Sequence, residues 1–457
     1  MGNYRTEDEF YTHEKFGKVP NGWEVKKLGD CFDFFPTSSY SREKLTDSGE
    51  CLYVHYGDIH TKFHEFIDFQ KEELPFVTED MASRFTKLKD GDLIIADASE
   101  DYEGVGKAVE VLNLKERSAI SGLHTLHLRT KDDCFVNGFK GYILNNEKVR
   151  RNILRSATGI KVYSVSKSGL KGIFLPKPPK PEQQAIASIL FKIDEAIKAK
   201  QDSIKASLKI KRGLIQQLLT GRLKPDGSWR SEQDFYKDEK FGNIPIGWKY
   251  VKLKDVCLGP GEYGANASAT DFIPNCPRYI RITDIDDYGN LIEDGKVGIE
   301  PEKVRNNLLK ENDFLFARTG DTVGKSLLYK ENMGLAAYAG YLIKFSFNQD
   351  IILPEYFNLI AKSDFFEAFK TAMKRVGAKP NINSREYGSF KFTLPLNIEE
   401  QKAIYQTIKP IDCSVLDKQS KIRILQRLKK SLMQNLLSGK VRVDVNKINK
   451  VLNNKAI

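Results

Sequence analysis

The most regular hydrophobic pattern in this chain occupies two stretches, residues 181–219 and 399–437. In both, aliphatic residues recur every three or four positions, a spacing that places them along one side of an α-helix. The first stripe contains Ile186, Leu190, Ile193, Ile197, Ile204, Ile215 and Leu218; the second contains Ile404, Ile408, Ile411, Val415, Ile422, Leu425, Leu432 and Leu436. A helix of this length measures about 58 Å, at about 1.5 Å per residue. The pattern predicts two long helices that pack on each other, antiparallel, as a coiled-coil spacer.

Residues at the ends of both stretches favour helix starts and stops. Pro181 suits a first helical turn, where its missing N–H has no partner to lose. Asn397 and Glu400 have the spacing of a capping box. Gly221 and Gly439 follow the last apolar residues, at a position where a helix commonly ends in a residue with positive φ.

The second stripe repeats the first at an offset of 218 positions, and the duplication extends well beyond the helices. Residues 10–30 reappear as 235–255 with 12 of 21 positions identical, and 53–59 and 91–96 match 279–285 and 312–317 as short predicted strands. The sequence therefore predicts two mixed α/β globular domains, each followed by a long helix. The expected boundaries are 1–178 for the first domain, 179–222 for its helix, 223–396 for the second domain, 397–443 for its helix and 444–457 for a tail.

Composition narrows the class of protein. The chain has 457 residues, 40% of them hydrophobic and 29% charged, which is typical of a soluble globular protein. No apolar run approaches the roughly 18 residues of a membrane span, and nothing suggests export, so we expect a cytoplasmic protein without membrane contact. The six cysteines form no CxxC pair, which favours reduced thiols and no metal site. A net charge of +11 points to a polyanionic partner.

The order of these segments resembles a known family. A globular unit, a helix opening with LPKPPKPEQQ and closing with LLTGR, and then both again, together with the ARTGDTVGK loop, are similar to the specificity subunit of type I restriction–modification systems. The resemblance covers residues 10–443. It implies two target recognition domains arranged with pseudo-twofold symmetry, each reading one half of a split, asymmetric double-stranded DNA target. It also implies that the helices set the gap and dock two methyltransferase subunits, through which restriction subunits join.

In such a complex the partners perform the chemistry, and S-adenosylmethionine belongs to the methyltransferase subunits. The chain itself is expected to have no catalytic residue and no cofactor. It lacks the Asn/Asp-Pro-Pro-Tyr/Phe motif of an aminomethyltransferase, and its Gly320-x-x-x-Gly324 loop is one residue too short for a phosphate loop. Three other hypotheses stay open: a stand-alone transcriptional repressor, a coiled-coil adaptor that binds no DNA, and a nuclease that uses Asp97 and Glu100.

The candidate DNA-binding residues are polar side chains in the loops shared by both halves. An Arg can bond guanine, an Asn can bond adenine bidentately, and a Lys can contact phosphate. The predicted set is His55, Lys107, Lys161, Tyr163, Arg281, Arg318, Thr319, Lys325, Lys379, Asn381 and Asn383. The alternatives are a surface turn for Arg318 and a salt bridge at the aligned positions His55 and Arg281. The candidate helix residues for spacing and partner docking are Ile186, Leu190, Ile193, Ile197, Ile404, Ile408, Ile411 and Val415.

Overall fold

A computed structural model describes residues 4–132, 134–239, 242–373 and 380–453 of the chain. The chain divides into two compact units. Unit 1 comprises residues 1–201 and 420–457, and unit 2 comprises residues 202–419. Among the described residues, no helix is both long enough and apolar enough to cross a membrane.

The two long helices are α7 (Lys180–Leu219) and α11 (Ile398–Leu436), each within one residue of its hydrophobic stretch. The expected boundary at residue 222 lies three residues beyond α7, and the one at residue 443 lies seven residues beyond α11. The residues Gly221 and Gly439, beyond their ends, both have φ of 68°, which confirms the predicted helix stops. Asn397 accepts a bond from the Glu399 N–H, 2.9 Å, as a cap should. The Glu400 carboxylate, however, turns to the domain instead of closing a capping box. Helix α12 (Val445–Asn453) occupies the segment expected to be a tail.

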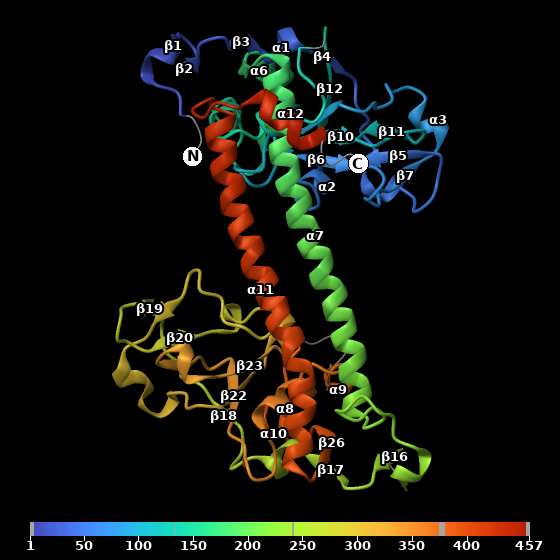
Figure 1. Cartoon of the computed structure of the whole chain (residues 1–457), viewed down its shortest axis with the longest axis vertical. Helices are drawn as coiled ribbons and strands as arrows, with labels where there is room; N and C mark the ends of the chain where they lie inside the picture. Colours follow the sequence, from blue (N-terminus) through green and yellow to red (C-terminus); the bar gives the residue numbers. More distant parts are fainter. Residues whose placement is uncertain (1–3, 133, 240–241, 374–379, 454–457) are drawn as a thin grey trace. The chain divides into compact units, whose positions relative to one another are not determined.

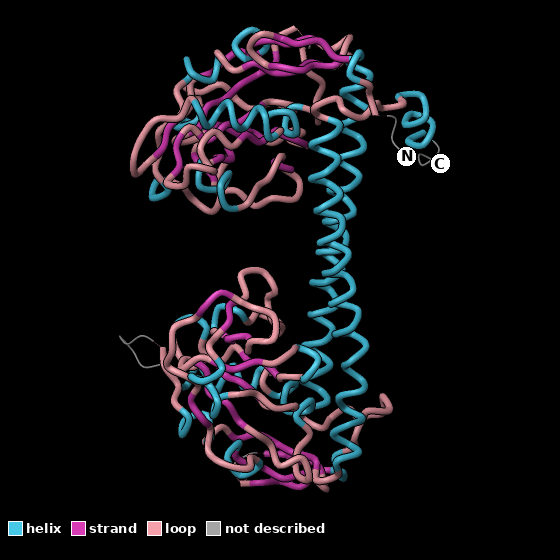
Figure 2. Tube along the Cα trace, turned by 90° about the vertical axis from the view of Figure 1, so that its left-hand side faces the viewer, coloured by secondary structure: helices cyan, strands magenta, loops and turns pink. Residues whose placement is uncertain are grey.

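Each unit contains half of each long helix, and within each unit the two halves run antiparallel (Figures 1 and 2). In unit 1, Asp194 of α7 lies against Lys429 of α11. In unit 2, Lys211 of α7 pairs with Asp412 of α11, and Ser207 accepts a bond from Lys418, 2.9 Å. Asp194 and Asp412, like Lys211 and Lys429, are 218 positions apart. The repeat therefore places the same ion pair in both units, with the roles of the helices exchanged.

Unit 1 is built on a five-stranded sheet of order β4-β12-β8-β10-β6, beside a three-stranded sheet of order β11-β5-β7. Strand β8 is central and antiparallel to both neighbours, whereas β5 and β11 are parallel. The strands of these sheets are β4 (Phe32–Phe35), β5 (Cys51–Val54), β6 (Phe66–Asp68), β7 (Phe76–Val77), β8 (Leu93–Ala96), β10 (Ala108–Leu112), β11 (Ser118–Ser121) and β12 (Thr125–Thr130).

Smaller elements complete unit 1. Two-stranded pairs join β1 to β2, β3 to β14 and β9 to β13. These strands are β1 (Phe10–His13), β2 (Gly17–Pro20), β3 (Glu24–Lys27), β9 (Ala98–Ser99), β13 (Tyr163–Ser164) and β14 (Phe174–Lys177). The short helices are α1 (Leu28–Cys31), α2 (Tyr56–Thr61), α3 (Glu79–Ala82), α4 (Lys140–Leu144), α5 (Glu147–Arg155) and α6 (Lys167–Lys171).

Unit 2 repeats this plan with two four-stranded sheets, of order β18-β25-β22-β23 and β19-β21-β20-β24. Strand β22 takes the central place of β8, and β20 pairs parallel with β24 as β5 does with β11. The sheet strands are β18 (Glu262–Tyr263), β19 (Thr270–Asp271), β20 (Arg278–Ile280), β21 (Val297–Gly298), β22 (Phe314–Ala317), β23 (Ser326–Leu328), β24 (Ala336–Tyr338) and β25 (Leu342–Phe345). The remaining elements are β15 (Phe235–Asp238), β16 (Gly242–Pro245), β17 (Trp248–Lys252), β26 (Lys391–Pro395), α8 (Pro354–Ile360), α9 (Asp364–Met373) and α10 (Ser384–Gly388).

The repeated tryptophans anchor each domain to the first turn of its helix. Trp23 and Trp248 are both 3% exposed. The Trp23 indole N–H donates to Glu182 at 2.8 Å, and the Trp248 N–H donates to Glu400 at 3.1 Å. A buried indole needs such a partner, and the carboxylate lies at a helix N-terminus, where negative charge is favoured.

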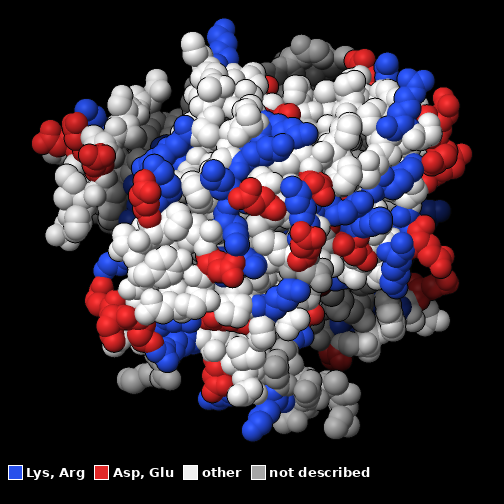
Figure 3. All heavy atoms as spheres, turned by 90° about the horizontal axis from the view of Figure 1, so that it is seen from above, with Lys and Arg blue, Asp and Glu red and all other residues white. Residues whose placement is uncertain are grey.

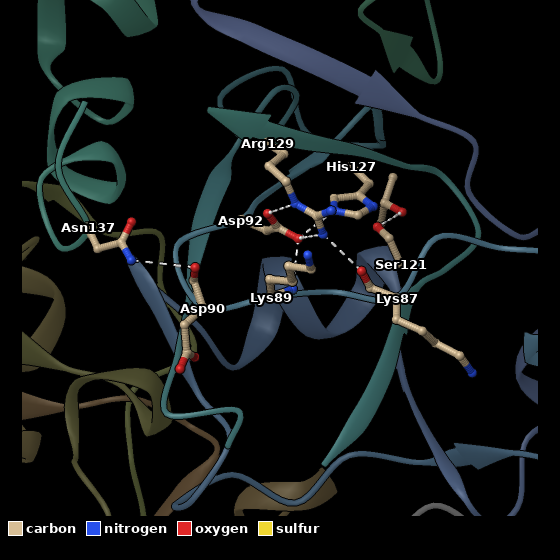
Figure 4. Close-up of polar contacts among 9 residues, drawn as sticks. Lys87, Lys89, Asp90, Asp92, Ser121, His127, Arg129 and Asn137 are labelled. Carbon is tan, nitrogen blue, oxygen red and sulfur yellow. Dashed lines mark hydrogen bonds and ion pairs between the residues drawn. The ribbon is translucent and has the colours of Figure 1, made fainter. Parts of the chain in front are cut away.

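A buried carboxylate fixes the turn that leads into β8 (Figure 4). Asp92 accepts bonds from His127 at 2.7 Å and from Arg129 at 2.7 and 2.8 Å, and it caps the turn through the Lys89 N–H. Burial raises the pKa of Asp92, but the bonds from Arg129 and His127 outweigh it, so the pKa lies below its ordinary value. Asp313 caps the same turn in unit 2. This cluster lies at the start of β8, and the predicted site loops follow the end of that strand.

Candidate nucleic-acid interface

The loops that carry the predicted residues gather where the central strand of each unit ends. In unit 1, β9 follows β8 directly and pairs with β13, which brings Tyr163 beside Ser99. The backbone N–H of Asp97 bonds to the carbonyl of His124, and the Val165 N–H bonds to the carbonyl of Asp97. The segment after β8 is thus held between two other loops. We call this set of loops the unit 1 edge: residues 55–60, 97–107, 122–124 and 158–166.

The unit 2 edge consists of the equivalent loops: residues 281–285, 318–325, 339–341 and 380–384. Here the Arg318 N–H bonds to the Tyr341 carbonyl, and the Ile382 N–H bonds to the Arg318 carbonyl. These bonds match those around Asp97, so Asp97 and Arg318 occupy the same position in the two units. The same fold position therefore carries a carboxylate in one unit and a guanidinium in the other.

His55 occupies a different local structure from the predicted strand. It is 6% exposed and is the N-cap of α2, where its Nδ1 accepts the Gly57 N–H at 3.1 Å. Burial lowers the pKa of His55, with Arg42 contributing in the same direction. A buried, capping imidazole organises the edge, and direct contact between His55 and DNA stays a prediction.

Lys161 and Tyr163 lie on a hairpin in which Thr158 and Ser164 exchange backbone hydrogen bonds of 2.9 and 2.8 Å. Lys161 is exposed at its tip, and Tyr163 packs against Tyr102 with ring centroids 5.1 Å apart. This geometry presents a cation to a ligand, as the phosphate-contact prediction requires.

Lys107 and Lys325 hold corresponding places in the turns after β8 and β22. Lys107 Nζ donates to the His60 carbonyl at 3.4 Å, and Lys325 Nζ donates to the Ile285 carbonyl at 3.4 Å. Burial lowers the pKa of Lys107. Lys325 also forms an ion pair with Asp287, 2.7 Å. Both ammonium groups brace neighbouring loops, which leaves them less free for phosphate than the sequence suggested.

Arg281 begins a 3-10 turn (Ile282–Asp284) and binds the carboxylate of Asp284 through two nitrogens, at 3.0 and 2.7 Å. The salt-bridge alternative therefore describes its contacts in the structure. Its side chain is still 36% exposed.

Arg318, Thr319 and Asn381 meet at the unit 2 edge. Thr319 and Asn381 form a β-bridge, and the Arg318 Nε lies 3.5 Å from the Asn381 amide oxygen. The guanidinium of Arg318 lies over the ring of Tyr263, 4.8 Å from its centroid. Stacking of this kind holds a guanidinium plane while leaving its N–H groups available.

Asn383 has a structural role that sequence reasoning did not identify. Its amide oxygen accepts the Glu386 N–H at 2.9 Å as the N-cap of α10, and the Glu386 carboxylate accepts the Asn383 N–H. Ser166 caps α6 in the same way in unit 1. Bidentate bonding to adenine needs both amide atoms, so Asn381, which is exposed, is the better placed of the two asparagines. Lys379 lies outside the described residues.

Two aromatic residues at the edges were missing from the predicted set. His124 has positive φ, its side chain is 51% exposed, and its Nδ1 lies 3.4 Å from the Asp97 carboxylate. Its equivalent, Tyr341, is 61% exposed. Aligning the repeats over 122–124 and 339–341 would have found both, since each follows a glycine within two positions. Burial raises the pKa of Asp97, with His124 opposing it.

The predicted helix residues divide between core and partly exposed positions. Ile186, Leu190, Ile197, Ile404, Ile408 and Val415 are buried, whereas Ile193 and Ile411 are half-buried. Ile186, Leu190, Ile404 and Ile408 belong to the helix–domain cores. The exposed aliphatic side chains of the helices are different ones, among them Ile210 and Leu428, which are 64% and 46% exposed.

Charge alone does not single out a binding face. On the face drawn in Figure 3, lysines and arginines lie interspersed with aspartates and glutamates. Many basic side chains are also paired, as in the contact of Lys429 with Glu65 and Asp194. The loops of the two edges are therefore a better guide to the site than the net charge.

Comparison with known proteins identifies the family. The model for the type I restriction modification DNA specificity domain matches twice, over residues 20–209 and 245–429. The MjaVIII specificity subunit of Methanocaldococcus jannaschii, a type I restriction enzyme subunit, is 25% identical over 453 residues, covering 95% of this chain and 98% of that protein. The StySPI specificity subunit of Salmonella potsdam is 20% identical over 424 residues, covering 86% and 83%.

The fold agrees with this assignment. The crystal structure of a type I restriction–modification S subunit from M. genitalium matches with a TM-score of 0.52 at 14% identity, covering 91% of this chain and 96% of that one. The two family matches each span one domain and the adjoining helix, as the duplication requires. This chain belongs to the type I restriction–modification DNA specificity family.

Proposed function

We propose that this chain is the DNA-recognition subunit of a type I restriction–modification complex in the cytoplasm, and that it reads an asymmetric, interrupted duplex sequence. Each edge contacts one half of the target. Two methyltransferase subunits dock on the chain and bring S-adenosylmethionine and the chemistry, and restriction subunits join through them. The chain itself supplies recognition and no catalytic group.

One observation carries this proposal: the two units have equivalent edges, but different side chains occupy the equivalent positions. Asp97 in unit 1 is equivalent to Arg318 in unit 2, His124 to Tyr341, and Ser166 to Asn383. A carboxylate accepts from cytosine N4, whereas a guanidinium donates to guanine O6 and N7. Two edges with opposite hydrogen-bonding character favour two different half-sites, and therefore an asymmetric target.

The exposed cations support contact with the DNA backbone. Lys161 stands at a hairpin tip, and Arg318 keeps donors free above Tyr263. Each Lys or Arg that neutralises a phosphate releases counterions, so affinity falls with salt. We expect salt-sensitive binding even though positive and negative side chains are interspersed on the face drawn in Figure 3.

The long helices supply places for two partners. Ile210 in unit 2 and Leu428 in unit 1 are exactly 218 positions apart, and both are exposed aliphatic side chains on the long helices. Because the two positions are related by the repeat, they would offer equivalent contacts to two copies of one methyltransferase subunit.

The decisive experiment maps methylated adenines in DNA from a host that expresses this chain with its methyltransferase partner. We expect a single two-part motif. Exchanging residues 1–178 for the matching domain of another family member should change one half of the motif and preserve the other. A change in both halves would contradict modular reading, and tight operator binding by the purified chain without partners would favour the repressor alternative.

A further inference from the structure

Two cysteines of unit 1 lie in contact although they are 103 positions apart. The sulfur atoms of Cys31 and Cys134 are 2.7 Å apart. Cys31 is the last residue of α1 and is 1% exposed, and Cys134 is half-buried in the segment between β12 and α4. A disulfide bond measures about 2.03–2.05 Å. The two sulfur atoms are in direct contact, so only a small approach separates this arrangement from a disulfide.

The surroundings make the two thiols unequal. The hydrogen bond with Cys31 and the positive charges of Lys177 and Lys26 lower the pKa of Cys134 to about 7. The contact with Cys134 and burial raise the pKa of Cys31. A thiolate is the nucleophile in disulfide exchange. Cys134, the more exposed of the two, is therefore the attacking group, and the buried Cys31 is placed to resolve the product.

The pair lies where the first domain meets α7. Gln183, in the first turns of α7, is fully buried; its side chain accepts the Val136 N–H at 2.9 Å and lies 3.5 Å from the Cys134 carbonyl. Cys31 follows β3, which pairs with β14, the strand that leads into α7. A disulfide between the sulfurs would link the segments that carry Cys31 and Cys134 near the N-terminal end of α7.

The second unit shows that this fold does not require thiols here. Its equivalent residues are Val256 and Ile351. The Asn348 N–H bonds to the Val256 carbonyl as the Lys131 N–H bonds to that of Cys31, and Gln401 donates to the Ile351 carbonyl at 2.9 Å. Aliphatic side chains occupy both equivalent positions, with Val256 buried and Ile351 39% exposed, so the fold needs no thiol at either position.

We propose that Cys31 and Cys134 form a reversible disulfide by exchange with a low-molecular-weight disulfide such as glutathione disulfide, and that this bond clamps the first domain to the root of α7. The Cys134 thiolate attacks one sulfur of glutathione disulfide, and the first glutathione thiolate leaves. The Cys31 thiol then gives its proton to the departing glutathione sulfur as the Cys31 sulfur attacks the Cys134 sulfur, and the second glutathione leaves as a thiol. The protein loses two protons and two electrons, and two glutathione thiols form.

The test uses the full-length chain in glutathione buffers of increasing oxidised fraction, followed by acid quenching, alkylation with N-ethylmaleimide under denaturing conditions and mass spectrometry. We expect two of the six cysteines to become protected together, and one cross-linked peptide pair joining Cys31 to Cys134. The oxidised chain should melt about 5 °C or more above the reduced chain. Six alkylated cysteines at every ratio, or an unchanged melting temperature, would overturn the proposal.

Two kinds of variant sharpen the result. The double variant Cys31→Val with Cys134→Ile copies the pair of unit 2, so it should fold and lose the entire redox response. In the single variant Cys31→Ser, Cys134 should retain one glutathione as a mixed disulfide, because the resolving thiol is gone. Equal glutathione capture by Cys413, which is exposed, would show that Cys134 is not selectively reactive and would overturn its assigned role.

Discussion

The repeated ion pair between the long helices makes a prediction about stability. In unit 1, Lys429 contacts Asp194 at 2.7 Å and Glu65 at 2.8 Å, and these three side chains are 15%, 27% and 14% exposed. Burial lowers the pKa of Lys429, but the two carboxylates outweigh it and the pKa lies above its ordinary value. Lys429→Met would therefore leave two carboxylates near each other without their shared cation.

The expected loss follows from this geometry. At an effective dielectric constant near 20, each close charge pair is worth about 4 kcal/mol before desolvation. Removing one partner of a largely buried cluster costs about 3–5 kcal/mol, and the partial exposure here favours about 3 kcal/mol. Lys211 is 10% exposed and pairs with the single carboxylate of Asp412, which is 39% exposed, so water can hydrate the carboxylate that loses its partner. Lys211→Met should therefore cost only about 1 kcal/mol.

Equilibrium urea unfolding, followed by circular dichroism, measures both losses. Lys430→Met is a matched control, because Lys430 is the exposed neighbour of Lys429 on the same helix. Because the pKa of Lys429 is raised, its contribution is complete at neutral pH and is lost only as the pH rises through that pKa, above about 10.5. A loss from Lys429→Met no larger than that of Lys430→Met, or equal losses for Lys429→Met and Lys211→Met, would refute this reasoning.

Three further predictions concern recognition and spacing. Arg318→Ala should weaken binding to one half-site by about 1–3 kcal/mol. Lys161→Ala should weaken binding to all DNA sequences alike and reduce by about 1 the slope of log affinity against log salt concentration. Fluorescence anisotropy with the mapped target distinguishes the two effects. Burial raises the pKa of Asp97, so the folded state disfavours its ionised form above about pH 4. Asp97→Asn should therefore raise the free energy of unfolding at pH 7 by about 0.5–2 kcal/mol, as measured by urea unfolding. The same variant should change one half of the methylated motif. Deleting residues 199–202 and 417–420 together removes about 6 Å from each long helix, nearly two base-pair steps of about 3.4 Å. Methylome sequencing should then show a shorter gap between the two halves of the DNA target. An unchanged gap would contradict the spacer role.

The architecture was predictable because its signals are local and occur twice. The stripe through Ile186 and Leu190 recurs at Ile404 and Ile408, and these four side chains are buried. Both helices begin and end within a residue of the hydrophobic stretches 181–219 and 399–437, and Gly221 and Gly439 mark the helix stops. The boundary expected at residue 443 was seven residues too late. Strand order was beyond reach, because strands β4 and β12 are distant in sequence and pair only through the fold.

The site was predictable at the level of loops and not of side chains. The sequence predicts Arg318 and Asn381 as candidates in two separate loops, and the structure brings them within 3.5 Å. The sequence predicts His55 and Asn383 as base readers, and that prediction stays open. The structure adds that each caps a helix, a role that depends on backbone turns absent from any residue pattern. The contact of Cys31 with Cys134 had no sequence signal.

The division of the chain has a consequence for its synthesis. Unit 2 is contiguous, whereas unit 1 needs residues 420–457, and Leu436 and Leu437 are buried in the same core as Leu190. A ribosome adding about 5–20 residues per second needs about 12–47 s to proceed from residue 201 to residue 437. Throughout that interval the first domain exposes an unfinished apolar surface. The domain made first is thus completed last, and any prematurely terminated chain leaves it open to chaperones and proteases.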